Sequence, residues 1–323
     1  MNSDIMFEKG SRFLVTGGAG FIGSNICEKL LEMGYFVRCL DNLSTGKMEN
    51  IAPFMENENF EFVKGDIRSL DDCKNAVKGI DYVLHQAAWG SVPRSIEEPL
   101  DYNENNITGT LNMMEAARHE GVKSFVYASS ASVYGDDELP VKIEESIGKM
   151  LSPYAFTKLA CEHYGSLYSS LYGLNTVGLR YFNVFGKNQD PMGAYASVIP
   201  KFIKEILKGE SVTIDGDGGQ TRDFVHIENV VQANLRAALY GEKAKGMVFN
   251  VAYGDTVTLL EFYNELTRLL RKDVKPNFGP VRPGDIRHSS ADTKKIREIL
   301  GYVPQVSFLE GLGKTIEWYK NNL

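Results

Sequence analysis

The sequence predicts an α/β fold, a doubly wound parallel sheet followed by a smaller mixed C-terminal domain. Three observations indicate it. Short apolar segments alternate with longer amphipathic ones over about the first 180 residues, a glycine-rich turn follows the first apolar segment, and the spacing becomes irregular afterwards. Uninterrupted apolar strands between helices are typical of a parallel sheet covered on both faces. A chain of 323 residues has room for two domains.

The elements follow from this alternation. The predicted strands are Arg12–Thr16, Tyr35–Asp41, Phe60–Lys64, Tyr82–Gln86, Ser124–Ser129 and Asn175–Arg180. The predicted helices between them are Phe21–Met33, Ser69–Val77, Asp101–Glu120 and Pro153–Tyr172. Beyond Tyr181 the predicted helices are Val198–Lys208, Ile227–Tyr240, Leu259–Leu270, Thr293–Leu300 and Phe308–Lys320, joined by loops rich in Gly and Pro. We expect residues 1–183 to form the first domain, with about 222–245 returning to it, and 184–323 to form mainly the second.

Composition excludes several classes of protein. Lys and Arg number 35 against 42 Asp and Glu, and this net charge of −7 argues against binding to nucleic acid. No apolar stretch is long enough for a membrane span, and no basic segment followed by an apolar run begins the chain, so we expect a cytoplasmic protein. The four cysteines form no C-x-x-C pair and lack zinc spacing. The segment 215–219 lacks the calcium-loop pattern and is predicted as a tight turn, so no metal site is expected.

The first predicted turn has the glycine spacing of a dinucleotide-binding loop. Gly17, Gly20 and Gly23 lie between the first strand and the first helix. The pattern alone is weak, and its position gives it weight. Glycines let the backbone approach a pyrophosphate, and the helix N-terminus offers free N–H groups to it. Asp41 ends the second strand, where a carboxylate binds ribose hydroxyls and repels a 2′-phosphate, so NAD is favoured over NADP.

A second pattern predicts proton transfer. Tyr154 and Lys158 are spaced to share one helix face, after Ser152 as a helix cap and Pro153 as the first helical residue. Ser130 lies at the end of a strand, where ligands bind in open α/β sheets. We expect the Lys158 ammonium to favour the Tyr154 phenolate, which then takes a proton from a sugar or alcohol. Taken alone, Tyr154 is better interpreted as an exposed helical tyrosine.

These residues together resemble the extended short-chain dehydrogenase/reductase family, and within it the nucleotide-sugar 4-epimerases. The resemblance covers nearly the whole chain. It rests on the segments Gly17–Gly23, Asp41-Asn42, His85–Ala88, Asn106–Thr110, Ser129–Gly135, Tyr154 with Lys158, Arg180–Val184, Gly219–Phe224 and Arg282–Asp285. It implies a Rossmann domain that binds NAD, a second domain that binds a UDP-sugar, and a homodimer formed by the helices Asp101–Glu120 and Pro153–Tyr172.

The site residues are predicted from the patterns and the resemblance together. The catalytic residues are Tyr154, Lys158 and Ser130. Residues expected at the cofactor are Gly17, Gly20, Phe21, Ile22, Gly23, Asp41, Asn42, Asp66, Ile67, Gln86, Ala87, Ala88, Asn106, Tyr154, Lys158 and Tyr181. Residues expected at the substrate are Ser91, Ser130, Ser132, Asn183, Ser197, Val198, Arg222, Arg282, Asp285 and Ser289. The resemblance implies that Asn106 contacts the nicotinamide half. It also implies that Asn183, Arg222 and Arg282 hold the diphosphate, and that Asp285 holds the uridine ribose.

Three features indicate which branch of the family the chain resembles. No acidic residue stands beside Ser130, in contrast to the dehydratases and decarboxylases of the family, which favours epimerisation. The segments 90–95 and 189–197 are similar to the subgroup acting on N-acetylated hexosamines, and Ser289 is small where the family gates the pocket by size. We therefore expect reversible conversion of UDP-N-acetylglucosamine and UDP-N-acetylgalactosamine through a 4-keto sugar.

The sequence is also compatible with other functions. The same chemistry on 6-carboxylated UDP-N-acetylhexosamines, or on UDP-glucose and UDP-galactose, is compatible with these motifs. Net oxidation or reduction is a further alternative. A non-catalytic NAD-binding regulator is a third, and the presence of both Tyr154 and Lys158 argues against it.

Overall fold

The structure is a computed structural model that describes residues 5–192, 197–281 and 287–322. Within these residues, seven parallel strands form the main sheet, in the order β12-β7-β5-β4-β1-β2-β3. Their bounds are β1 Arg12–Thr16, β2 Phe36–Asp41, β3 Phe60–Lys64, β4 Tyr82–His85, β5 Ser124–Ser130, β7 Thr176–Tyr181 and β12 Met247–Val251. The order reverses between β1 and β4, so the carboxyl ends of these strands open a crevice there.

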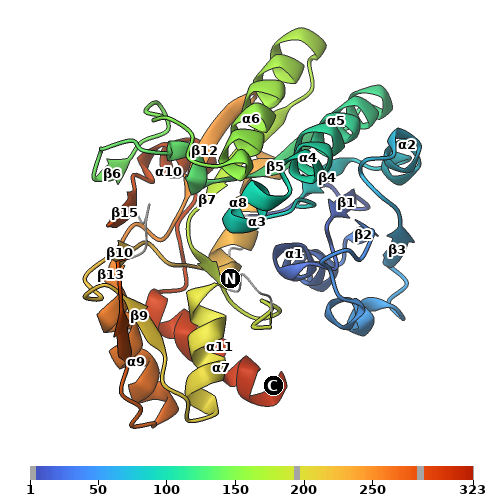
Figure 1. Ribbon diagram of the computed structural model, residues 1–323. Helices are drawn as coiled ribbons and strands as arrows, with labels where there is room; N and C mark the ends of the chain where they lie inside the picture. Colours follow the sequence, from blue (N-terminus) through green and yellow to red (C-terminus); the bar gives the residue numbers. More distant parts are fainter. Residues whose placement is uncertain (1–4, 193–196, 282–286, 323) are drawn as a thin grey trace.

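Helices cover both faces of this sheet (Figure 1). One face carries α1 Phe21–Glu32 and α8 Ile227–Leu239. The other carries α2 Leu70–Val77, α5 Gly109–Glu120 and α6 Pro153–Tyr172. Successive side chains of one strand serve the two layers: Val15 packs in the cluster with Ile26 and Val230, whereas Leu14 packs with Met113. This alternation of buried side chains is what the uninterrupted apolar strands predicted.

The smaller C-terminal part is built from short strands and helices around its own apolar cluster. Its four-stranded sheet has the order β13-β10-β15-β6. The strands there and in two further pairs are β6 Val141–Lys142, β8 Val184–Phe185, β9 Thr213–Asp215, β10 Thr221–Arg222, β11 Val225–His226, β13 Val257–Thr258, β14 Asn277–Gly279 and β15 His288–Ala291. The helices are α7 Val198–Leu207, α9 Leu259–Leu270 and α11 Phe308–Asn322. The helix α10 Lys294–Leu300 instead packs Ile296 and Leu300 into the apolar cluster of α1 and α8.

The predicted fold class is confirmed, one predicted helix needs correction, and two elements were not predicted. The segment expected as one helix, Asp101–Glu120, begins earlier and changes pitch: α4 Pro99–Tyr102 runs into a π-helical turn, Asn103–Thr108, before α5. A short helix, α3 Val92–Glu97, precedes it and was not predicted. The strand β12 also escaped prediction, and it pairs with β7 at the edge of the main sheet. The helix α8 packs on the main sheet, and β12 is one of its strands. We therefore propose that the segment returning to the first domain extends from about 222 to Val251.

Candidate active site

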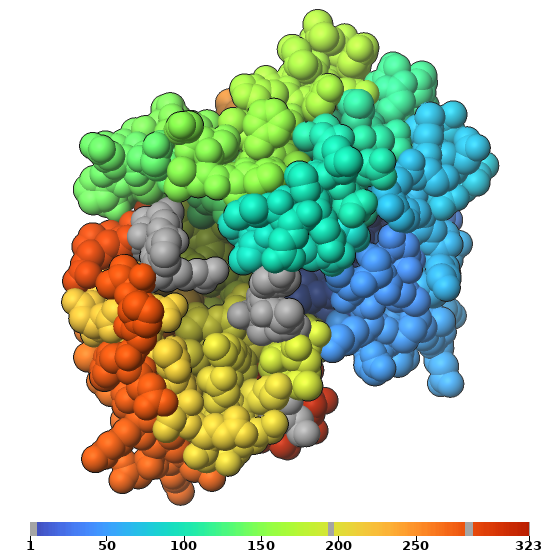
Figure 2. All heavy atoms as spheres, in the orientation of Figure 1, coloured from blue at the N-terminus to red at the C-terminus, as the bar shows by residue number. Residues whose placement is uncertain are grey.

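A cleft of about 370 Å³ opens at the carboxyl ends of the central strands. Figure 2 shows the surface hollowed between the teal segments around α3 and α4 and the yellow segments around α7. Of the residues predicted at the cofactor, all except Asp66 and Asn106 line the cleft. The lining also includes residues that were not predicted at the cofactor: Leu40, Ser44, Thr45, Lys47, Asn50, Gly65, Trp89, Gly90, Asn105, Ala128, Ser129, Asn188 and Asp190.

The glycine turn between β1 and α1 forms one end of this cleft. Gly17 has φ +67°, and a Cβ atom there would lie 2.7 Å from the backbone N of Ala87. A Cβ atom on Gly23 would lie 2.1 Å from the carbonyl oxygen of Gly17. Gly20 caps α1 without a side-chain hydrogen bond, so the first N–H groups of the helix stay available to a ligand. This backbone fits a pyrophosphate group bound at the helix N-terminus.

Asp41 lies beside this turn at the end of β2, buried at 7% exposure. Its Oδ2 accepts the N–H of Ala19 at 3.0 Å, and its Oδ1 accepts that of Leu43 at 2.8 Å. Burial raises the pKa of the Asp41 carboxyl, and the two backbone bonds oppose that rise. Each oxygen keeps a second lone pair, so the carboxylate can still accept ribose hydroxyls. The residues fit the adenosine half of NAD.

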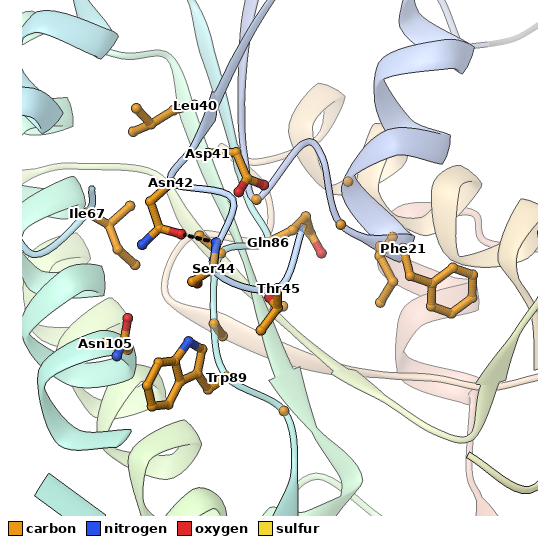
Figure 3. A pocket seen from close by; sticks show the side chains of 18 of the residues that line it. Phe21, Leu40, Asp41, Asn42, Ser44, Thr45, Ile67, Gln86, Trp89 and Asn105 are labelled. Carbon is orange, nitrogen blue, oxygen red and sulfur yellow. Dashed lines mark hydrogen bonds between the residues drawn. The ribbon is translucent and has the colours of Figure 1, made fainter. Parts of the chain in front are cut away.

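Asp66 lies just outside the cleft lining. Its carboxylate accepts bonds from Arg68, with Nη2–Oδ2 at 2.7 Å, and from Asn42 at 3.0 Å. The Arg68 hydrogen bonds lower the pKa of Asp66 to about 2. Its neighbours Gly65 and Ile67 line the cleft, and Figure 3 shows Ile67 and Asn42 on the same side of it. The structure thus places Asp66 as a support of Asn42, while its predicted contact with the adenine stays a prediction.

Asn106 lies behind the cleft wall, 1% exposed, and is not among the residues lining it. Its Nδ2 donates to the carbonyl oxygen of Trp89 at 3.1 Å and to Thr157 Oγ1 at 3.0 Å, and its Oδ1 accepts the Trp89 N–H at 2.9 Å. The adjacent residue Asn105 lines the cleft together with Trp89, as Figure 3 shows. The π-helical turn contains both asparagines, and such turns often occur at functional sites. Asn106 therefore holds the cleft-lining loop through Trp89.

The predicted catalytic side chains come together at the other end of the cleft. Ser130 ends β5, and its Oγ accepts the N–H of Ser132 at 3.1 Å. Ser152 caps α6 by accepting the Ala155 N–H at 3.1 Å, with Pro153 as the first helical residue. Tyr154 and Lys158 then line the cleft from that helix.

The protonation of this pair is governed by burial. The Lys158 Nζ donates to the carbonyl oxygen of Ala128 at 2.9 Å and lies 6.0 Å from the centre of the Tyr154 ring. Burial lowers the pKa of Lys158. Burial also raises the pKa of Tyr154, and a hydrogen bond with the Ser130 hydroxyl opposes that rise. The sequence predicts that the Lys158 ammonium favours the phenolate form of Tyr154. In the structure, the interaction that lowers the pKa of Tyr154 is its hydrogen bond with Ser130.

A closed network of amides and a phenol lies at the floor of the cleft. The Tyr181 hydroxyl donates to Gln86 Oε1 at 2.9 Å and accepts from Asn234 Nδ2 at 2.9 Å. Gln86 Nε2 donates to Asn234 Oδ1 at 3.0 Å and closes the ring. Asn234 comes from α8 and is fully buried. The sequence missed it, because no motif connects residue 234 with the glycine loop.

The residues predicted at the substrate are spread over several loops and strands. Ser91 caps α3 and accepts the Arg94 N–H at 3.3 Å, and Asn183 is exposed with its Nδ2 bound to the carbonyl oxygen of Asp223. Ser197 and Val198 begin α7, where Ser197 forms no side-chain cap. Arg282 and Asp285 lie outside the described residues.

Two of the predicted substrate residues are neighbours. Arg222 on β10 is the register partner of Ser289 on β15, and both are half-buried. The two strands are parallel, so both side chains leave the same face of the small sheet. Arg222, which is expected to bind the diphosphate, therefore lies beside Ser289, which is expected to limit the size of the sugar.

Comparison with known proteins gives the family. The sequence profile of the NAD dependent epimerase/dehydratase family matches residues 13–252. The chain belongs to this family. Members of the epimerase/dehydratase family depend on NAD, and the expected cofactor is therefore confirmed.

Three relatives match nearly the whole chain. A protein from Methanocaldococcus jannaschii named putative UDP-glucose 4-epimerase is 40% identical, covering 96% of this chain and 98% of its own. The solved structure of a UDP-N-acetylglucosamine 4-epimerase from Methanobrevibacter ruminantium, in complex with UDP-N-acetylmuramic acid, is 40% identical with a TM-score of 0.90 and covers 98% and 100%. A UDP-glucuronic acid 4-epimerase from Bacillus cereus, solved with UDP-glucuronic acid and NAD, is 33% identical with a TM-score of 0.88 and covers 97% and 100%. This epimerase/dehydratase chain is thus similar to 4-epimerases of three different UDP-sugars.

Among the described residues, no group of three or more His, Cys, Asp and Glu side chains is arranged to hold a metal ion. In the same part of the chain, no helix has the length and apolar character needed to cross a membrane.

Proposed function

We propose that this protein catalyses the reversible 4-epimerisation of UDP-N-acetylglucosamine and UDP-N-acetylgalactosamine. The coarser activity, 4-epimerisation of a UDP-sugar by an isomerase, is the one named for its relatives. The observation that carries the proposal is that Tyr154 and Lys158 line the cleft that begins at the glycine turn, and that the Ser130 hydroxyl is hydrogen-bonded to Tyr154.

The chain's own residues supply proton transfer and binding. Tyr154 takes the proton of the C4 hydroxyl, and Ser130 holds the same oxygen through its hydroxyl. Lys158, held by the Ala128 carbonyl, keeps positive charge beside the phenol. NAD bound along the glycine turn would supply the hydride chemistry at C4. The 4-keto sugar turns about its diphosphate linkage between the two transfers, so that C4 is inverted and the cofactor is regenerated.

The proposed sugar rests on three observations. Ser289 is a small residue opposite Arg222, and the N-acetylglucosamine 4-epimerase is similar over 98% of the chain. Arg94 of α3, whose guanidinium lies over the Trp89 ring, is already paired with Glu98 at 2.7 Å. An ion-paired guanidinium is poorly suited to hold a sugar carboxylate, which favours the neutral N-acetylated sugar over its uronic acid.

We also propose that the protein forms a homodimer through α5 and α6. The two helices lie side by side at the outside of the molecule (Figure 1). Leu167, Leu171 and Tyr172 of α6 are exposed there. A patch of large apolar side chains on one helix is typical of an interface between subunits.

The experiment that tests the function is a substrate panel. The protein is incubated separately with UDP-N-acetylglucosamine, UDP-N-acetylglucosaminuronate and UDP-glucose, and the C4 configuration is followed by NMR. We expect the highest kcat/KM for UDP-N-acetylglucosamine, with the same equilibrium mixture reached from UDP-N-acetylgalactosamine. Higher kcat/KM for the uronate would move the assignment to that sugar.

A further inference from the structure

A fully buried ion pair lies directly beneath the catalytic residues. Glu162 on α6 and Arg180 on β7 have side chains that are 6% and 2% exposed. The pairing is bidentate, with Arg180 Nε at 2.8 Å from Oε1 and Nη2 at 2.7 Å from Oε2. Glu162 Oε1 also accepts the hydroxyl of Ser129 at 2.5 Å. One carboxylate therefore joins α6, β5 and β7.

The network reaches the cleft through Ser129, which lines it, and through neighbours of Arg180 and Glu162 that line it. Ser129 lies between Ala128 and Ser130, so its side chain points away from that of Ser130. Arg180 precedes Tyr181, and Glu162 follows Lys158 by four residues on the same helix face. A shift of the carboxylate would thus move β5 and α6, which carry the proposed catalytic residues, and β7, which carries Tyr181.

The charge of Glu162 also reaches Lys158. On α6, the groups near Lys158 are Tyr154, the Cys161 thiol and Glu162. From β4 it faces His85, whose pKa is lowered to about 3 mainly by burial and which is therefore neutral. Burial raises the pKa of Cys161, so this thiol is also neutral. Two groups of α6 oppose the effect of burial on the pKa of Lys158, first the Cys161 thiol and then the Glu162 carboxylate. Because the thiol is neutral, Glu162 is the anion of the two, and it shares its charge with the Arg180 guanidinium at 2.7 Å.

We propose that Glu162 is a positioning residue of the active site, which fixes β5 and β7 against α6 and provides the negative charge that balances the Lys158 ammonium. The proposal rests on the function proposed above, since it assigns Glu162 a role in the same proton transfer. Glu162 touches neither the cleft nor its contents, and it acts through Ser129, Arg180 and Lys158. A buried ion pair of this kind is costly to desolvate and is a weak source of net stability, which is consistent with a positioning role.

Two variants separate charge from geometry. Glu162→Gln keeps the size of the side chain and removes its charge. The alkaline limb of the kcat profile should move to lower pH by about one unit, because Lys158 loses its proton more easily. Glu162→Asp keeps the charge and is too short to reach both partners. It should lower kcat roughly 10- to 100-fold, as misplaced groups do, with the alkaline limb near its wild-type position.

A second measurement is independent of sugar turnover. The ionisation of Tyr154 is followed in the NAD-bound protein by ultraviolet difference titration against the Tyr154→Phe variant in the same background. In Glu162→Gln the midpoint for Tyr154 should rise, since less ammonium remains beside the phenol. Glu115→Gln is the matched control: Glu115 on α5 is also bidentate with an arginine, at 2.6 Å for both contacts with Arg118. The Glu115→Gln substitution should leave both the Tyr154 titration midpoint and the alkaline limb of the kcat profile unchanged.

The outcomes distinguish this proposal from the proposed function. If wild-type protein epimerises no UDP-sugar while the Tyr154 midpoint still rises in Glu162→Gln, the function is wrong and the charge role of Glu162 stands. If wild-type protein is active and Glu162→Gln loses only folded protein, with the alkaline limb and the Tyr154 midpoint unmoved, Glu162 is purely structural and the proposal is overturned.

Discussion

Arg222 and Ser289 occupy opposite positions on the parallel strands β10 and β15. The backbone N–H of the next residue, Asp223, donates to the carbonyl oxygen of Ser289 at 2.9 Å, which fixes the two strands in this register. The residue proposed to neutralise the diphosphate therefore stands beside the residue proposed to leave room for the sugar. This relationship gives the substrate prediction a definite position in the fold.

Ser289→Tyr should depress kcat/KM for UDP-N-acetylhexosamines more than for UDP-glucose or UDP-galactose. A tyrosine fills the space beside Arg222 that the N-acetyl group needs in both orientations of the sugar. Overfilling a packed site costs roughly 1–3 kcal/mol, or about 5- to 150-fold in affinity. Both substrate classes are measured on wild type and variant under one set of conditions.

Ser290→Tyr is the matched control for that substitution. Ser290 is the next residue of β15, so its side chain leaves the opposite face of the strand. It should leave the ratio of the two specificities unchanged. An unchanged ratio in Ser289→Tyr as well would show that Ser289 is not the gate.

Tyr154→Phe should abolish most turnover and leave UDP-sugar binding nearly intact. Loss of a positioned acid or base typically costs ~10²–10⁴-fold in rate. The ring and its edge contact with Tyr102, at 6.3 Å between centroids, are retained. kcat is measured by NMR and binding by calorimetry. Tyr102→Phe, which removes only the hydroxyl that accepts the Ser91 N–H, should lose far less activity. Near-normal turnover in Tyr154→Phe would require another base.

Asn234→Leu should weaken the retention of NAD. The substitution keeps the volume of the side chain and leaves Gln86 and Tyr181 without their shared partner. An unsatisfied buried polar group costs about 1–3 kcal/mol, so NAD should be lost on dialysis more readily than from wild type. The NAD content of protein denatured after dialysis gives the measurement. Asn264→Leu, at an exposed position of α9, is the control, and equal NAD content in all three proteins would contradict the role of the network.

Stability should fall as the pH is lowered from 6.5 because of His85. This ring is 3% exposed, and its nitrogens are bound to Thr16 Oγ1 at 2.7 Å and Thr110 Oγ1 at 3.0 Å. Its pKa is lowered to about 3, mainly by burial, so the unfolded state binds a proton that the folded state does not. The stabilisation is complete above the unfolded pKa and is lost as the pH falls. It should amount to about 2 kcal/mol between pH 7 and pH 5.

Denaturant unfolding at the two pH values measures this dependence, with NAD held at a fixed saturating concentration. His85→Gln should lose the His85 component of the pH dependence, whatever its effect on overall stability. His119→Gln is the control, because His119 is exposed. Identical pH slopes in wild type and His85→Gln would show that His85 does not titrate as described.

The sequence predicted those features that depend on local pattern. The glycine turn, the end of β2 at Asp41 and the cap of α6 at Ser152 each rest on residue types with fixed backbone requirements, and the structure has them at the expected positions. The edge strand β12 was missed because it is short and lies between irregular loops. The pitch change at Asn103–Thr108 was missed because a π-helical turn leaves the helical residue pattern nearly intact.

The parts of the site that depend on tertiary packing could not be predicted. Asn234 reaches the cleft from α8, and Glu162 reaches Ser129 and Arg180 only because β5 and β7 are adjacent in the sheet. The sequence also assigned Asn106 to the cofactor itself, since a motif gives the position of a side chain along a helix and not its direction. The structure directs that amide to the backbone of Trp89.

The most direct test of the central claim uses UDP-N-acetylglucosamine carrying deuterium at C4. The protein is incubated with this substrate in ordinary water without added nucleotide, and the product is examined by NMR for both configuration and isotope at C4. The account predicts UDP-N-acetylgalactosamine that retains the deuterium at C4, because the hydride leaves that carbon and returns to it within one active site. UDP-N-acetylgalactosamine with hydrogen at C4, or substrate left unconverted, would contradict the account.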